Sequence, residues 1–277
     1  FKEQMTQTKV FKVEKLPFLE LRYISHVTSC DKPHNHNELT ITAIKSGHIN
    51  ILFDDKTDVL KQGGLSVVNP DTVHSASLGE VQSYGCYVMY LDKEWCIEIQ
   101  NSLYEDMNGY LPLHVTLVQD EKLYNGFIEV CNELFLKDTP LLEKEEKIVE
   151  FISELFLMFC DINQVVQTYK TTSLHIKEIK SYIDYNFLED ILLEDIASHV
   201  NMSVVHLIRL FKEEFSLSVH SYILNKKVHL AKELLSRNTP IAEAAQMSGF
   251  FDKSHLNRSF KRVFQLTPKE YQKNIFS

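Results

Sequence analysis

The N-terminal third of the chain alternates between apolar and polar positions in short runs. Residues 19–22 alternate, and residues 39–44, 49–53 and 65–68 are mostly apolar or β-branched. Turn residues such as Gly63-Gly64 separate the runs. A period of two predicts half-buried strands, and short strands joined by tight turns favour a β-sandwich or a small β-barrel.

The period changes to three and four residues after about residue 95, which places apolar side chains on one face of each of two helices. The second stripe is long and wide. We therefore expect this stripe either to be covered by the β domain or to pair with its copy in another subunit. The second alternative predicts a homodimer, and we favour it. The stripes consist of Leu123, Phe127, Val130 and Leu134, and of Ile148, Phe151, Ile152, Leu155, Phe156 and Phe159.

A mostly polar segment, residues 164–173, separates these helices from a C-terminal region that reads as entirely helical. The fold class predicted is therefore α+β with several domains. We expect a β-barrel domain over residues 1–115, a helical linker or dimerisation segment over 116–170 and an all-helical domain over 171–277. The short helices predicted in the last domain cover about 174–187, 192–200, 203–214, 218–236, 240–248, 252–263 and 268–274.

Composition and charge exclude several classes of protein. Hydrophobic residues make up 44% of the 277 positions and charged residues 24%, which excludes a disordered or fibrous chain. No run approaches the roughly 18 apolar residues of a membrane span. The net charge of -9 combines a balance of +6 over residues 196–277 with -15 over residues 1–195, so the C-terminal end is suited to a polyanion. Five scattered cysteines, none in a C-x-x-C pair, and the lack of a signal-peptide pattern favour the cytoplasm.

An internal repeat is the strongest signal in the sequence. Residues 206–222 and 255–271, offset by 49, are identical at eight of seventeen positions. In each copy a short helix carrying a small alanine (Ala197, Ala245) precedes a turn and a second amphipathic helix. This pattern predicts two helix-turn-helix motifs, whose second helices fit the DNA major groove.

At these residues the chain resembles the AraC/XylS family of bacterial transcription regulators. The resemblance rests on Leu207-x-Arg209-x-Phe211-Lys212, on a run from Gly249-Phe250 to Phe260-Lys261, and on Thr267-Pro268-x-x-Tyr271. It implies that the second helix of each motif contacts bases and phosphates, although Arg209 and Arg258 also suit intradomain ion pairs. The implied DNA-binding residues are Val205, Ile208, Arg209 and Lys212 in the first motif, and Ser254, His255, Arg258 and Lys261 in the second.

The N-terminal histidines resemble those of the cupin barrel that many AraC-type regulators use for sensing. Pro33-His34-Asn35-His36-Asn37-Glu38 carries an H-x-H element, and Pro70 to His74 form a P-x-x-x-H element that is one residue shorter than in metal cupins. We expect His34, His36, Glu38 and His74 to line a ligand pocket, with no metal or other cofactor. A divalent metal site and a purely structural turn remain as alternatives.

These expectations predict a regulator that binds promoter DNA and a small-molecule effector, acts as an activator through RNA polymerase and is not an enzyme. The sequence contains no G-x-S-x-G, P-loop, G-x-G-x-x-G or H-E-x-x-H motif. Two alternatives stay open. The first is a metal-dependent cupin enzyme joined to a DNA-binding domain, and the second is a regulator without a ligand.

Overall fold

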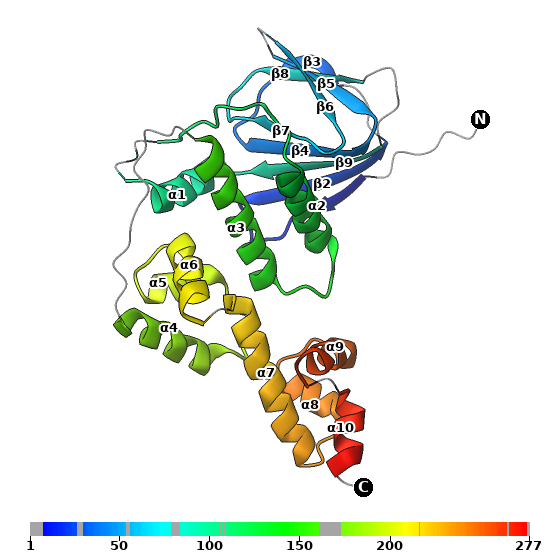
Figure 1. Cartoon of the computed structure of the whole chain (residues 1–277), viewed down its shortest axis with the longest axis vertical. Coiled ribbons are helices and arrows are strands. Elements are labelled where there is room, and N and C mark those ends of the chain that lie inside the picture. Colours follow the sequence, from blue (N-terminus) through cyan, green and yellow to red (C-terminus); the bar gives the residue numbers. More distant parts are fainter. Residues whose placement is uncertain are drawn as a thin grey trace, which may run out of the picture. The chain divides into compact units, whose positions relative to one another are not determined.

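The computed structural model describes residues 8–26, 30–53, 56–78, 84–105, 107, 109–160, 173–215, 217–264 and 266–275. The chain divides into two compact units (Figure 1). The first unit contains Phe1–Lys137 and Lys147–Thr168, and the second contains Asp138–Glu146 and Tyr169–Ser277. The predicted α+β class, with sheets first and helices last, is confirmed. The predicted division at residues 115 and 170 stays a prediction, and the polar boundary segment lies almost wholly outside the described residues.

Two antiparallel sheets form the body of the first unit. The six-stranded sheet has the order β1-β2-β9-β4-β7-β10 and the four-stranded sheet the order β3-β8-β5-β6. Consecutive strands therefore often belong to different sheets, as in a double-layered β-sandwich. The strands are β1 Thr8–Phe11, β2 Leu19–His26, β3 Cys30–His34, β4 Leu39–Ser46, β5 His48–Leu52, β6 Thr57–Lys61, β7 Leu65–Val68, β8 His74–Leu78, β9 Tyr84–Leu91 and β10 Leu117–Val118.

Apolar side chains from both sheets meet in a common core. Ile44 and Cys86, which are paired across β4 and β9, come from the six-stranded sheet. Ile49, Ile51 and Leu60 come from the four-stranded sheet. Each of these side chains is at most 5% exposed. Because strand side chains alternate between faces, this inward set leaves the other face of each sheet for helices or solvent.

Three helices accompany these sheets: α1 Lys93–Leu103, α2 Glu121–Phe135 and α3 Leu141–Phe159. The Tyr124 hydroxyl of α2 donates to the carbonyl oxygen of Ile44 at 2.9 Å, which ties α2 to strand β4. The rings of Phe127 and Phe151 lie 5.6 Å apart, so α2 and α3 pack together.

The wide apolar stripe of α3 is covered within the chain. Ile148, Ile152, Leu155 and Phe156 are each 0% exposed. Of the two alternatives for this stripe, the structure favours burial by the chain itself. The predicted homodimer stays a prediction, and the buried stripe offers it no contact surface.

The second unit contains seven helices among its described residues, in addition to the first residues of α3. The predicted helix boundaries lie close to the observed ones. Helix α7 joins the two predicted motifs and buries Leu224, Val228, Ala231 and Leu235. The helices are α4 Ser173–Asn186, α5 Leu193–His199, α6 Val204–Phe215, α7 Val219–Ser236, α8 Ile241–Met247, α9 Lys253–Phe264 and α10 Pro268–Ile275.

One buried amide fixes the segment that follows α1. Gln100 is 0% exposed, and its side-chain Nε2 donates to the carbonyl oxygen of Leu111 at 2.6 Å. Its Oε1 accepts the backbone N–H of Leu111 at 2.9 Å. Buried backbone groups require partners, so Gln100 replaces the missing secondary-structure bonds of this residue.

We predict that Gln100→Leu lowers the free energy of unfolding by about 1 to 3 kcal/mol, because leucine leaves the Leu111 N–H without its acceptor and leaves the carbonyl oxygen only the weak contact with the Cys160 thiol. Urea denaturation followed by circular dichroism measures this change. Gln246→Leu, the same change at an exposed position of α8, provides the control and is expected to change stability by less than about 0.5 kcal/mol. Equal effects of the two substitutions would contradict the assignment.

Candidate ligand pocket and DNA-binding helices

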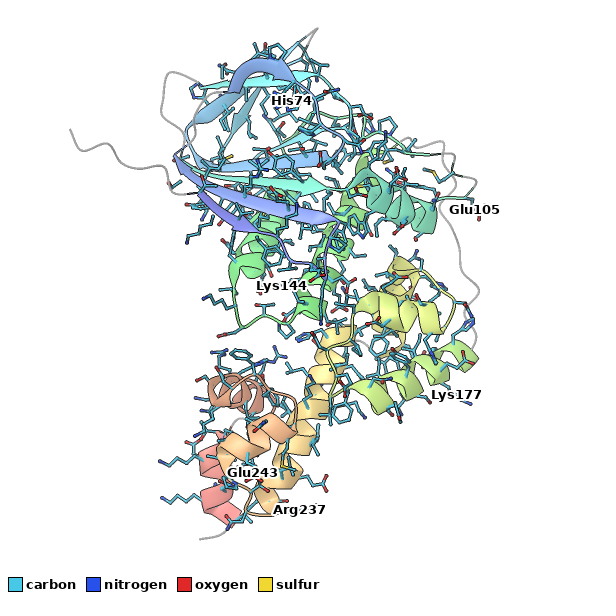
Figure 2. All side chains as sticks on the ribbon, turned by 180° about the vertical axis from the view of Figure 1, so that it is seen from behind. His74, Glu105, Lys144, Lys177, Arg237 and Glu243 are labelled. Carbon is cyan, nitrogen blue, oxygen red and sulfur yellow. The ribbon has the colours of Figure 1, made fainter. Side chains whose placement is uncertain are left out.

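Three of the predicted ligand-binding residues form a histidine cluster at one end of the four-stranded sheet. His34 at the end of β3 is the cross-strand partner of His74, the first residue of β8. His74 is labelled in Figure 2. His36 follows in the next loop. The ring of His74 lies 4.5 Å from that of His34 and 5.0 Å from that of His36. One ring nitrogen from each histidine lies within 4.8 Å of the others.

Backbone carbonyls orient two of these rings. Nδ1 of His74 lies 3.0 Å from the carbonyl oxygen of Thr72, and Nδ1 of His36 lies 3.1 Å from that of Glu38. A carbonyl oxygen only accepts, so each Nδ1 carries the hydrogen and each neutral ring keeps a lone pair on Nε2. Burial lowers the pKa of His74, the hydrogen bond to the Thr72 carbonyl opposes this, and the neighbouring His34 and His36 lower it further. His74 therefore favours the neutral imidazole, the form in which histidine binds metals.

A cavity of about 400 Å³ opens beside this cluster. Its volume lies within the range of small-molecule sites. It includes three of the four predicted ligand-binding residues, whereas His74 is not among those that line it. The Glu38 carboxylate lies 4.0 Å from Nδ1 of His36. The lining residues are Lys12, Pro17, Phe18, Leu19, Glu20, Arg22, His34, His36, Glu38, Tyr90 and Asp92.

Charged groups on strand β2 shape this cavity. Arg22 contacts Glu20 at 2.6 Å and lies over the Tyr90 ring, 4.7 Å from its centroid. Lys12 contacts the same carboxylate at 3.0 Å, and its hydrogen bond lowers the pKa of Glu20. The sequence reasoning missed these residues. Their signal was present, because two opposite charges separated by one position in a strand must lie on the same face.

The two helix-turn-helix motifs begin their second helices in the same way. Ser203 Oγ accepts the backbone N–H of His206 at 3.2 Å, and Asp252 Oδ1 accepts that of His255 at 2.7 Å. Both capping residues precede their helix, and they are 49 positions apart. Such side-chain caps satisfy donors that the first turn of a helix leaves unpaired.

Aromatic contacts behind the two helices also repeat. The rings of Phe211 and Tyr222 lie 5.4 Å apart in the first motif. Those of Phe260 and Tyr271 lie 5.5 Å apart in the second. The repeat in the sequence is therefore a repeat of packing, and it anchors α6 to α7 and α9 to α10 in the same manner.

The turns between the paired helices depend on left-handed backbone conformations. Asn201 has a φ of 51° and Gly249 a φ of 73°. Glycine and asparagine adopt this region at the lowest cost. Lys227 Nζ donates to the carbonyl oxygen of Gly249 at 3.3 Å, which fixes the second turn to α7.

Helix α6 is the second helix of the first motif. Of its four predicted DNA contacts, two are exposed and two are buried. Arg209 and Lys212 are exposed. Val205 and Ile208 are only 3% and 5% exposed. The thymine contacts predicted for the two apolar side chains are not accessible in this structure, and they stay predictions.

The other helix, α9, exposes Ser254, Arg258 and Lys261. His255 is half-buried beside the Phe250 ring, and burial lowers its pKa. Arg258 also forms an ion pair with Asp138 at 3.1 Å, with the two side chains 59% and 52% exposed. A pair this exposed contributes less than about 1 kcal/mol, so it does not bar Arg258 from binding a phosphate or a base.

Comparison with known protein families finds matches to residues of both units. The family model described as "AraC-like ligand binding domain" matches residues 17–158, more than half of the chain. The model described as "Helix-turn-helix domain" matches residues 196–274. No described helix is long and apolar enough to cross a membrane.

Two curated relatives agree with these matches, and one solved structure is similar to part of the chain. The HTH-type transcriptional regulator YbfI of Bacillus subtilis is 26% identical over 227 residues, covering 80% of each chain. The multiple antibiotic resistance protein MarA of Salmonella typhimurium is 32% identical over 103 residues, covering 37% of this chain and 81% of MarA. An AraC-type regulator structure from Chromobacterium violaceum is 26% identical, with a TM-score of 0.35, and covers 37% of this chain and 92% of its own. The chain belongs to the AraC family of transcriptional regulators, with an N-terminal ligand-binding domain and a C-terminal DNA-binding domain.

Proposed function

We propose that the effector of this regulator is a polar small molecule that binds in the cavity beside the histidine cluster. The observation that carries the proposal is the lining of this cavity. Arg22, Glu20, His34, His36 and Glu38 offer hydrogen-bond donors, acceptors and both signs of charge within about 400 Å³. Such a molecule changes DNA affinity only if it binds two states of the protein unequally.

We propose that Arg209 and Lys212 on α6, with Ser254, His255, Arg258 and Lys261 on α9, contact promoter DNA. The exposure of the basic side chains on both helices supports this role, since lysine and arginine bind phosphates and arginine also reads guanine. Val205 and Ile208 join the contacts where they become accessible.

Further features of this function rest on the family and on cysteine chemistry. We propose that the chain activates transcription through RNA polymerase, acts as a homodimer and catalyses no reaction, as the resemblance implies. Four described cysteines, Cys86, Cys96, Cys131 and Cys160, are buried and free. Free thiols suit a reducing compartment and support a cytoplasmic location.

For DNA binding we predict that Arg209→Ala and Arg258→Ala each weaken affinity about tenfold, which is within the range for losing one arginine contact. The probe is a fluorescent duplex selected by the wild-type chain from a randomised library, and anisotropy gives the affinity. Arg237→Ala is the matched control, because this exposed arginine lies at the end of α7, outside both recognition helices. The proposal fails if all three variants bind alike.

The histidine cluster favours a second candidate, in which the sensor takes a divalent metal alone or together with the effector. The cupin resemblance leaves such a site as an alternative, and the residues present fit it. His34, His36 and His74 supply three nitrogens, and carbonyls hold the outer nitrogen of two rings, as is usual for metal-binding histidines. A bound metal would supply a Lewis acid for an oxygen of the effector.

Thermal unfolding against sugars, amino acids, fatty acids and zinc distinguishes the two candidates, because a ligand that binds only the folded state raises the melting temperature. We expect a polar metabolite to raise it, and Arg22→Met to remove the effect by deleting a charged group of the cavity. A zinc effect that is lost in His74→Ala but kept in His48→Ala would establish the metal site. A metabolite effect that survives Arg22→Met would contradict the assigned cavity.

A further inference from the structure

Three charged residues near the start of α3 are buried. Lys144 and Glu145 are each 6% exposed and Glu146 is 3% exposed (Lys144 is labelled in Figure 2). These residues belong to the second unit, whereas α3 from Lys147 onward belongs to the first. Burial of charge is costly unless the charged groups find partners. The partners of both glutamates are backbone amides at the starts of other helices.

Glu146 completes the N-terminus of α7. Its Oε1 accepts the N–H of Val219 at 2.9 Å and its Oε2 that of His220 at 3.4 Å. Ser218 Oγ accepts the N–H of Ser221 at 3.1 Å. The first three amides of α7 therefore all have acceptors, and Glu146 supplies two of them. A carboxylate at this end also interacts favourably with the helix dipole.

Glu145 performs the same task for α5. The residue before this helix is Leu192, whose side chain cannot accept a hydrogen bond. Glu145 Oε2 instead accepts the N–H of Leu193 at 2.9 Å. Two consecutive residues of α3 thus hold the starts of two different helices.

We propose that Glu145 and Glu146 are positioning residues for DNA binding, through which α3 sets the placement of the recognition helix α6. The proposal rests on the proposed function in that α6 is taken as a DNA-reading helix. The start of α7 directly follows α6 in the chain, so Glu146 fixes the connection at the end of α6, whereas Glu145 holds the start of α5, the helix that packs before α6 in the first motif. The same helix α3 carries Ile148, Ile152 and Leu155, which are fully buried residues of the ligand-binding unit.

This arrangement makes the contacts sensitive to the position of α3. A helix moves as one body, so a shift or rotation of α3 displaces both carboxylates together. Hydrogen bonds weaken steeply outside a narrow range of distance and angle, and a buried amide left without an acceptor is costly. Two positions of α3 would therefore correspond to two arrangements of helices α5, α6 and α7. An effector that binds one arrangement more tightly increases the population of that arrangement.

The surroundings of Glu145 give the contact a pH signature. Burial raises the pKa of Glu145 to about 7, helped by the negative charges of Glu194, Asp195 and Glu146 and opposed by the Leu193 N–H. The folded chain thus binds this proton more tightly than the unfolded chain, whose carboxyl has the ordinary value of 4.5. This contribution to stability is complete below about pH 4.5 and is lost as the pH rises through about 7.

The test uses the full chain and the selected duplex described above. Glu145 uses one oxygen, which glutamine retains, so we expect Glu145→Gln to bind DNA like the wild type and Glu145→Ala to bind about tenfold more weakly. Glu146 uses two oxygens, and glutamine keeps one, so affinity should fall from wild type to Glu146→Gln to Glu146→Ala. Glu154→Ala, which removes an exposed carboxylate of the same helix, is the control and should bind normally.

Two further measurements separate positioning from general destabilisation. Amide hydrogen exchange of folded protein should quicken at the first turns of α5 and α7 in the alanine variants, and stay unchanged in Glu154→Ala. The melting temperature of Glu145→Gln relative to wild type should increase between pH 5 and about pH 8, because only the wild type loses the proton.

The proposal is overturned if alanine at both positions leaves DNA affinity unchanged, or if glutamine and alanine at position 145 weaken it equally. Should the alanine variants fail to fold, the two glutamine variants decide, since only Glu146→Gln is expected to weaken binding. Loss of affinity in Arg209→Ala and Arg258→Ala with normal binding by the glutamate variants refutes this inference alone. Normal binding by the arginine variants refutes the proposed function instead.

Discussion

The DNA-binding unit depends on acceptors for the unpaired amides at the starts of its helices. Its helices are short, and α5 and α8 have only seven residues each, so the unpaired first turn is a large fraction of each helix. Side chains supply acceptors at the starts of five of the helices, whereas α8, which begins after Pro240, has no side-chain cap. Ser203 and Asp252 cap α6 and α9, and Thr267 and Glu270 exchange hydrogen bonds at the start of α10. For α5 and α7, Glu145 and Glu146 of α3 supply acceptors in addition to the local side chains Asp195 and Ser218.

The ligand-binding unit offers a contiguous set of contacts from the cavity to α3. Arg22 lies on β2, which pairs with β9, and β9 pairs with β4. The Tyr124 hydroxyl joins β4 to α2, and the Phe127 and Phe151 rings join α2 to α3. These packed elements connect the proposed effector cavity to α3 within the ligand-binding unit, and coupling between the sites would require α3 to have two arrangements that an effector binds unequally.

The repeat and the amphipathic helices could be predicted from the sequence because they depend on local spacing. Histidines 34, 36 and 74 were also recognisable, since short motifs carried two of them and the third followed a proline turn. The roles of Glu145 and Glu146 could not be predicted this way. In sequence they resemble an ordinary solvated stretch of charges, and their partners lie 48 and 73 residues further along the chain.

The burial of Val205 and Ile208 escaped prediction for a related reason. Helical spacing assigns a residue to a face of its own helix, but it cannot say what covers that face. Arg22 and Glu20 show the opposite case. Their alternation with apolar residues placed them correctly in a strand. Their role in the cavity depends on strands β1 and β9, which meet β2 only in the folded sheet.

We propose that both helix-turn-helix motifs bind the same duplex at the same time. Helix α7, which joins them, has 18 residues and is therefore about 27 Å long, close to one turn of DNA. Hydroxyl-radical footprinting of the wild-type chain on its selected duplex tests the claim directly. Two protected segments about 10 base pairs apart on one face of the duplex are the predicted result. A single protected segment would show that only one motif binds DNA and would contradict simultaneous binding by both motifs.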